Sequence, residues 1–164
     1  MHESVKKYVW LPAIAGLVVL ADQLTKWWVL QTIAAYDVIP IIPNFLNLIH
    51  VQNPGGAFGF FANQSSQVRA LFFVFFSLVA VILILYLYKS TPAKFKWLLA
   101  GFSLIVGGAV GNLIDRLRFG YVVDFLDVYA GNLHWPAFNI ADSAITVGMV
   151  IFAVYLITKK YPVQ

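Results

Sequence analysis

The sequence of 164 residues contains no cysteine, and only 11% of its residues are charged. The lack of cysteine excludes disulfide bonds, thiolate metal ligands and a cysteine nucleophile. Soluble domains have about 25% charged residues, whereas 61% of this sequence is hydrophobic. The sequence therefore predicts a single integral-membrane domain over residues 1–164, with too few polar residues for a separate soluble domain of ordinary size.

Two further classes of site lack their usual sequence signals. The serines lie in no Gly-x-Ser-x-Gly nucleophile motif, which argues against a serine hydrolase. His50 and His134 are isolated, and no spacing of His, Asp and Glu indicates a metal centre. The net charge of +4 is modest and comes from lysines at the ends of apolar runs, so it indicates membrane topology and not nucleic-acid binding.

Four apolar runs are each long enough to cross a bilayer, which takes about 20 residues. They cover approximately residues 9–30, 70–88, 97–114 and 138–157. A helix satisfies its own backbone polar groups in lipid, so we expect an all-α membrane protein with four transmembrane helices. The first run is longer than the apolar part of a signal peptide and contains charged residues, so we expect it to be retained.

Two connections, residues 31–67 and 115–137, join these helices on one side of the membrane. Within the first, residues 45–52 are strand-like in composition, and we expect a small extracytoplasmic β element there. We expect the second connection to form a short outer loop or helix.

The orientation follows from the basic residues, because lysine and arginine are enriched on the cytoplasmic side. The lysines outside the first run fall on one side of the four-span arrangement: Lys6, Lys7, Lys89, Lys94, Lys96, Lys159 and Lys160. We therefore expect a multi-pass membrane protein with both termini in the cytoplasm. The five tryptophans lie near the ends of the runs, as in an interfacial belt.

Asp124 and Asp142 are the strongest candidate functional residues, because ionisable groups near an apolar span are costly and usually functional or paired. Asp124 lies between Val123 and Phe125, and Asp142 follows Asn139 on nearly the same helical face. The alternative is that each acid merely caps a helix or lies in a solvated loop. Two carboxyl groups that share a proton are, however, a known device for peptide hydrolysis.

Two other motifs have both a structural and a functional interpretation. Asp22 and Lys26 are one helical turn apart and can form a pair; this pair either sets the depth of the helix, with Lys26 reaching outward, or lies near a site. Residues 53–59 are rich in glycine, which is typical of a tight turn. The functional alternative is that Asn53 presents its amide to a substrate backbone while the glycines, Gly55 among them, allow close approach.

The third apolar run ends in a pattern that combines packing and polar residues. Ser103, Gly107 and Gly111 form a ridge of small residues that is typical of closely packed membrane helices. Asn112 and Arg116 share the next part of one helical face and could orient a carboxylate or bind a substrate carbonyl. A lone arginine would be interpreted as an interfacial anchor, but its polar neighbours favour a site.

Together these residues make the chain resemble the lipoprotein signal peptidases (signal peptidase II), bacterial aspartyl enzymes that trim prolipoproteins. The resemblance covers nearly the whole chain, and its five motifs occur in the order of the family. The motifs are Asp22-Gln23-x-Thr25-Lys26, Asn53-x-Gly55-x-Ala57-Phe58, Gly107-Gly108-Ala109-x-Gly111-Asn112-x-x-Asp115-Arg116, Gly120-x-Val122-x-Asp124-Phe125 and Phe138-Asn139-x-Ala141-Asp142.

The resemblance implies that Asp124 and Asp142 are catalytic. The residues that it implies for binding or orienting the substrate are Asp22, Lys26, Asn53, Gly55, Asn112, Arg116 and Asn139. The implied partners are membrane lipid and the signal peptide of a prolipoprotein whose cysteine already carries diacylglycerol, with cleavage just before that cysteine. The resemblance further implies inhibition by globomycin and no metal or organic cofactor, and we expect a monomer.

Two other functions remain as alternatives. A small proton-coupled transporter would use the membrane acids as a relay, but the polar residues crowd at one face and the run of residues 70–88 carries no charge. A non-catalytic assembly factor would not need paired acids. The sequence does not decide which aspartate is the general base and which is the general acid.

Overall fold

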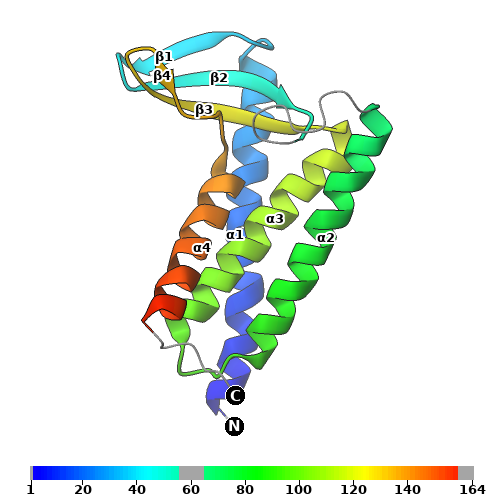
Figure 1. Ribbon diagram of the computed structural model, residues 1–164, viewed down its shortest axis with the longest axis vertical. Helices are drawn as coiled ribbons and strands as arrows, with labels where there is room; N and C mark the ends of the chain where they lie inside the picture. Colours follow the sequence, from blue (N-terminus) through cyan, green and yellow to red (C-terminus); the bar gives the residue numbers. More distant parts are fainter. Residues whose placement is uncertain (1, 56–64, 159–164) are drawn as a thin grey trace.

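The computed structural model describes residues 2–55 and 65–158. Within these residues the chain forms a bundle of four helices, with a four-stranded antiparallel sheet across one end (Figure 1). The helices are α1 (His2–Thr32), α2 (Ser66–Ser90), α3 (Lys96–Phe119) and α4 (Ile140–Ile157). The start of α1 and the end of α4 lie at the end of the bundle away from the sheet.

All four helices are long and apolar enough to cross a membrane, in agreement with the four apolar runs. The third helix extends beyond the predicted residue 114 to Phe119, so Asp115 and Arg116 belong to α3 and not to an outer connection. The helix ends where Gly120 adopts a left-handed conformation (φ 78°) and donates its backbone N–H to the Arg116 carbonyl oxygen.

Helix α3 is the most buried of the four and lies against the other three. A Cβ atom added to Gly107 would lie 2.8 Å from the Val18 Cβ and 2.9 Å from the Ala15 Cα of α1. One added to Gly111 would lie 2.6 Å from a carboxylate oxygen of Asp22. The predicted close packing is thus confirmed at Gly107 and Gly111, and it brings the polar part of α1 against α3.

The sheet has the order β1-β2-β3-β4, with β1 (Val38–Ile42), β2 (Leu46–Asn53), β3 (Val122–Ala130) and β4 (Leu133–His134). The prediction of a strand near residues 45–52 is confirmed by β2. In the register of β2 and β3, Val51 lies opposite Asp124 and Asn53 opposite Val122.

The prediction of a short loop or helix for the second connection is wrong, because β3 and β4 lie there. The description "all-α" is accordingly too narrow. The start of β3 does not alternate between buried and exposed residues: Val122, Val123, Asp124 and Phe125 are all buried. Val123 and Phe125 pack with Val29 of α1. A strand covered on both faces lacks the two-residue period by which a strand is recognised in a sequence.

Candidate active site

Asn139 connects the two candidate aspartates. It lies just before α4, where its side-chain oxygen accepts a hydrogen bond from the Asp142 backbone N–H at 2.9 Å, while its own N–H donates to Asp142 Oδ2 at 3.3 Å. This reciprocal cap fixes the first turn of α4. The Asn139 Nδ2 donates to Asp124 Oδ1 at 2.7 Å. A single buried residue therefore contacts both carboxylates.

Asp124 is buried within β3, with an exposed fraction of 2%. Its other oxygen, Oδ2, accepts a hydrogen bond from Asn53 Nδ2 at 2.9 Å. The register of β2 and β3 brings Asn53 diagonally across from Asp124, within reach of a side-chain contact. Burial raises the pKa of Asp124 to about 7, and the nearby negative charge of Asp142 also raises it, although the two amide hydrogen bonds act in the opposite direction.

Asp142 has a different environment at the first turn of α4. Asn112 Nδ2 donates to Asp142 Oδ1 at 2.8 Å, in addition to the backbone N–H of Asn139 at Oδ2. The N-terminus of a helix also stabilises a negative charge through the helix dipole. The Asn112 amide is itself held, because its oxygen accepts hydrogen bonds from Lys26 Nζ at 3.0 Å and from Asn139 Nδ2 at 3.2 Å.

A buried ion cluster lies behind the two aspartates. Lys26 Nζ lies 2.8 Å from Asp22 Oδ2 and 2.9 Å from Asp115 Oδ2, and all three side chains are at most 2% exposed. The predicted pair of Asp22 and Lys26 is confirmed, but Lys26 points into the protein and not outward. Asp22 also accepts a hydrogen bond from the Ala141 N–H, and Asp115 accepts one from the Val123 N–H. The cluster thus holds the backbone of the residue just before each candidate aspartate.

Among the residues that the structure describes, Arg116 makes no hydrogen bond to either aspartate and instead joins α3 to α2. Its Nη1 lies 3.5 Å from Ser77 Oγ and 3.4 Å from the Asn112 carbonyl oxygen, and its guanidinium lies 5.5 Å from the centre of the Phe73 ring. Its positive charge nevertheless interacts with both candidate aspartates through space. Arg116 therefore contributes charge to the site without a direct contact.

Gly55 closes a turn next to Asn53. It adopts φ 115°, which favours glycine, and donates its N–H to Asn53 Oδ1 at 2.9 Å. The Asn53 amide is thus fixed at both ends, by Asp124 and by Gly55. The rest of the predicted glycine-rich clamp, including Gly56 and Gly59, lies outside the described residues.

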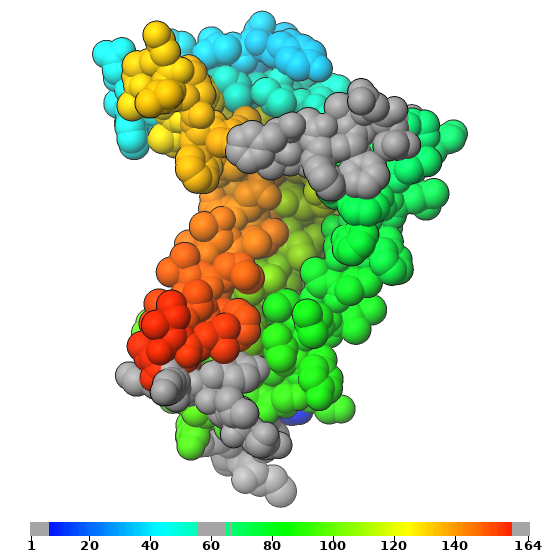
Figure 2. All heavy atoms as spheres, viewed as in Figure 1, coloured from blue at the N-terminus to red at the C-terminus, as the bar shows by residue number. Residues whose placement is uncertain are grey.

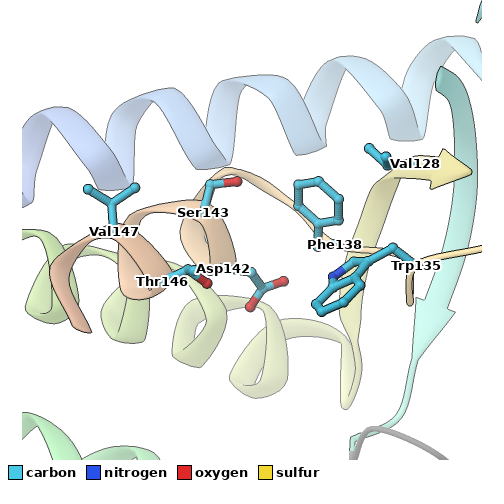
Figure 3. A pocket seen from close by; sticks show the side chains of 7 residues that line it. All are labelled: Val128, Trp135, Phe138, Asp142, Ser143, Thr146 and Val147. Atoms are coloured by element: carbon cyan, nitrogen blue, oxygen red, sulfur yellow. The ribbon is translucent and has the colours of Figure 1, made fainter. Parts of the chain in front are cut away.

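A pocket of about 480 Å³ opens beside Asp142. Its lining comes from β3, the link between β4 and α4, and α4 itself: Val128, Trp135, Phe138, Asp142, Ser143, Thr146 and Val147. Figure 3 shows Trp135 and Asp142 facing the same space. The sheet projects beyond the helices above α4, so this side of the molecule is hollowed beneath it (Figure 2).

Sequence reasoning missed several of these residues. Asp115 stands in one of the quoted motifs, but its pairing with Lys26 depends on the packing of α1 against α3. Trp135 was assigned to an interfacial belt, and nothing in its local sequence indicates a pocket. Within residues 2–55 and 65–158, no group of three or more His, Asp or Glu residues could hold a metal ion.

Residues 14–158 match the family described as Signal peptidase (SPase) II. The chain belongs to this family. It is 49% identical to the lipoprotein signal peptidase of Desulforapulum autotrophicum, over 97% of this chain and 98% of the relative. It is 44% identical to that of Syntrophus aciditrophicus, over 89% of this chain and 91% of the relative.

A solved bacterial membrane enzyme has the same fold, with a TM-score of 0.80 and 33% identity over 92% of this chain and 88% of the other. A signal peptidase is a protease, so this signal peptidase II homologue is an enzyme, and its four apolar helices make it a multi-pass membrane protein. The alternative of a proton-coupled transporter is not supported.

Proposed function

We propose that this signal peptidase II is an aspartic endopeptidase that removes the signal peptide from diacylglyceryl-modified prolipoproteins, with cleavage just before the lipidated cysteine. The observation that carries the proposal is that Asn139 contacts both Asp124 and Asp142. Two linked carboxyl groups, Asp124 buried and Asp142 half-buried, fit a mechanism in which one is protonated and the other is ionised. Membership of the family supplies the substrate class.

The two environments favour Asp142 as the general base and Asp124 as the general acid. Asp124 is buried in a strand and its pKa is raised to about 7, so a large fraction of it is still protonated near neutral pH, where an ordinary aspartate is ionised. Asp142 accepts two hydrogen bonds at a helix N-terminus, where negative charge is stabilised. Asp142 also lines the pocket, from which water and substrate reach it.

The reaction then proceeds by acid–base catalysis. Asp142 takes a proton from a water molecule, and the oxygen of that water attacks the scissile carbonyl carbon. At the same time Asp124 gives its proton to the carbonyl oxygen. The tetrahedral diol that forms breaks its carbon–nitrogen bond as the amine takes a proton from Asp142 and a diol hydroxyl returns one to Asp124. Asn53, Asn112 and Asn139 hold the two carboxyl groups in position during these steps.

Asn53 has a more specific proposed role than the sequence indicated. Its side-chain N–H₂ donates to Asp124 and its oxygen accepts from Gly55, so both ends of the amide are engaged within the protein. We assign it mainly to orienting Asp124. Direct binding of the substrate backbone by Asn53 stays a prediction and uses the remaining N–H of the amide.

Cleavage should decline as the pH rises through about 7, because Asp124 must be protonated to act as the acid. Above that pH, kcat/KM should fall roughly tenfold per pH unit, provided that the protein remains folded. A series of initial rates from pH 5 to pH 9, with thermal unfolding measured at each pH, checks this expectation. A constant kcat/KM between pH 7 and pH 9 would show that Asp124 is not the acid.

The proposed substrate is lipid-anchored, and the enzyme should cleave the diacylglyceryl-modified precursor and not the unmodified one. An acyl chain that stays in the bilayer contributes about 0.8 kcal/mol per buried CH₂ relative to water. A gel-shift assay of both precursors with the purified enzyme in lipid measures this preference. Equal cleavage of both would remove the lipid requirement, even if the two aspartates proved catalytic. We expect globomycin to inhibit the reaction of the modified precursor.

We propose that the sheet faces the outside of the inner membrane and that both termini are cytoplasmic. The described lysines Lys7, Lys89, Lys94 and Lys96 lie at the end of the bundle away from the sheet. Because the chain has no cysteine, single cysteines at Ser65 and Asn132 give a clean test. Both should react with a membrane-impermeant thiol reagent in intact cells, and protection of both positions would reverse the topology.

A further inference from the structure

A second buried carboxylate, that of Asp127, lies in β3 three residues beyond Asp124. Asp127 is 7% exposed, and its two oxygens have separate partners. Asn47 Nδ2, directly opposite on β2, donates to Oδ2 at 2.8 Å, and His134 Nδ1 on β4 lies 2.8 Å from Oδ1. A carboxylate only accepts hydrogen bonds, so Nδ1 of His134 carries the proton in this contact.

His134 belongs to a hairpin whose backbone is bonded to β3 at Trp135 and again at Phe138, which pairs with Leu126. Strand β4 has only two residues, which pair with Tyr129 and Ala130 of β3. Strand β4 is thus a short strand at the edge of the four-stranded sheet. The His134 ring also stacks on the Tyr129 ring, with centroids 4.9 Å apart and planes 7° from parallel. The side chain of His134 thus anchors β4 through one hydrogen bond to Asp127 and one ring contact.

The hairpin leads directly into the pocket beside Asp142. Trp135 follows His134 and donates its backbone N–H to the Val128 carbonyl oxygen at 2.8 Å. The Trp135 ring is 67% exposed, and it lines the pocket together with Val128 and Asp142 (Figure 3). Few contacts bury this ring, so its position depends on the backbone that carries it.

We propose that the His134–Asp127 contact positions Trp135 as one wall of the pocket beside Asp142, and that this wall binds the apolar part of the substrate next to the scissile bond. His134 and Asp127 are positioning residues, because they act through Trp135 and do not touch the reacting atoms. The inference rests on the proposed function of the site. It adds a determinant of substrate binding that lies outside the catalytic pair.

Two variants of His134 separate its two contacts. His134→Asn places an amide N–H near the position of Nδ1 and keeps the hydrogen bond without the ring. His134→Phe keeps a ring on Tyr129 without a donor.

We expect His134→Phe to raise KM for the lipidated precursor about tenfold, as for the loss of one hydrogen bond to a charged group. The kcat of this variant should stay within about twofold of the wild type. His134→Asn should remain near the wild-type KM, as should the control Leu133→Ala, whose side chain is 80% exposed.

Coupling to Trp135 tests the mechanism. Trp135→Ala should also raise KM, and the double variant with His134→Phe should be no worse than Trp135→Ala alone, since both remove the same wall. Fully additive effects, an unchanged KM in His134→Phe, or a loss of kcat with KM unchanged would each overturn the proposal.

A measurement without substrate separates this proposal from the proposed function. A spin label on a single cysteine at Asn132, in the turn of the hairpin, is specific because the chain has no other cysteine. Its mobility should rise in His134→Phe and stay at the wild-type level in His134→Asn. Equal mobility in all three proteins would overturn the anchoring role, whatever the activity. If the wild type did not cleave the lipidated precursor, the proposed function would fail, and the label would still report on the hairpin.

Discussion

Asp124→Asn and Asp142→Asn should each reduce cleavage of a lipidated precursor by about 10²–10⁴-fold, the usual contribution of a general acid or base. An amide at position 142 cannot take a proton from water, and an amide at position 124 cannot give one to the carbonyl oxygen. Turnover of the purified variants in lipid, measured by gel shift, checks the expectation. The loss should appear in kcat, because neither change removes the apolar lining of the pocket.

The matched control is Asp37→Asn, which makes the same change of charge on an exposed residue before β1. It should leave turnover within about twofold of the wild type, as expected for a surface substitution away from the site. Thermal unfolding should accompany each assay, because both oxygens of Asp124 accept hydrogen bonds and an amide N–H₂ there would face a donor. A folded Asp124→Asn or Asp142→Asn protein with near wild-type turnover would rule out the two-aspartate mechanism.

The helices were predictable because each apolar run is long, and length and composition alone identify a span. Their ends were less predictable. The third apolar run stops near residue 114, yet α3 continues to Phe119 because Gly120 provides the left-handed cap. β3 was missed for a physical reason: its first four residues are buried on both faces, so they lack the alternation of an exposed strand.

The residues of the site were predictable from their motifs, but their contacts were not. Asn112 and Arg116 were expected to act together on a carboxylate. Asn112 hydrogen-bonds Asp142, whereas Arg116 joins α3 to Ser77 of α2. Asp115 and Asp127 depend on pairing with residues 80 or more positions away in the chain, Lys26 and Asn47. Such pairs follow from helix packing and strand register, which no local pattern encodes. The pocket beside Asp142 was unpredictable for the same reason.

Lys26 offers the largest expected effect on stability. Its ammonium is the positive member of a buried cluster with Asp22 and Asp115, and it also donates to the oxygen of Asn112. Lys26→Met removes the charge but keeps most of the apolar stem. Removing one partner of a buried ion pair costs about 3–5 kcal/mol, because the other charge is left uncompensated. The free energy of unfolding in mixed micelles should fall by this amount.

The same variant should also lose kcat. Without Lys26, the Asn112 oxygen loses one of its two donors, so the amide is less firmly held with its N–H₂ toward Asp142. The matched control is Lys96→Met, which makes the same change on an exposed lysine at the start of α3 and should alter stability by no more than about 0.5 kcal/mol.

A second substitution tests whether charge is the cause. Asp22→Asn in the Lys26→Met background removes one of the two carboxylates left uncompensated, and an asparagine oxygen can still accept the Ala141 N–H. The double variant should therefore recover part of the lost stability, although Asp22→Asn alone should be destabilising. Strictly additive losses would show that the cluster acts through packing and not through charge. A Lys26→Met protein as stable as the wild type would show that the ammonium contributes nothing to the fold.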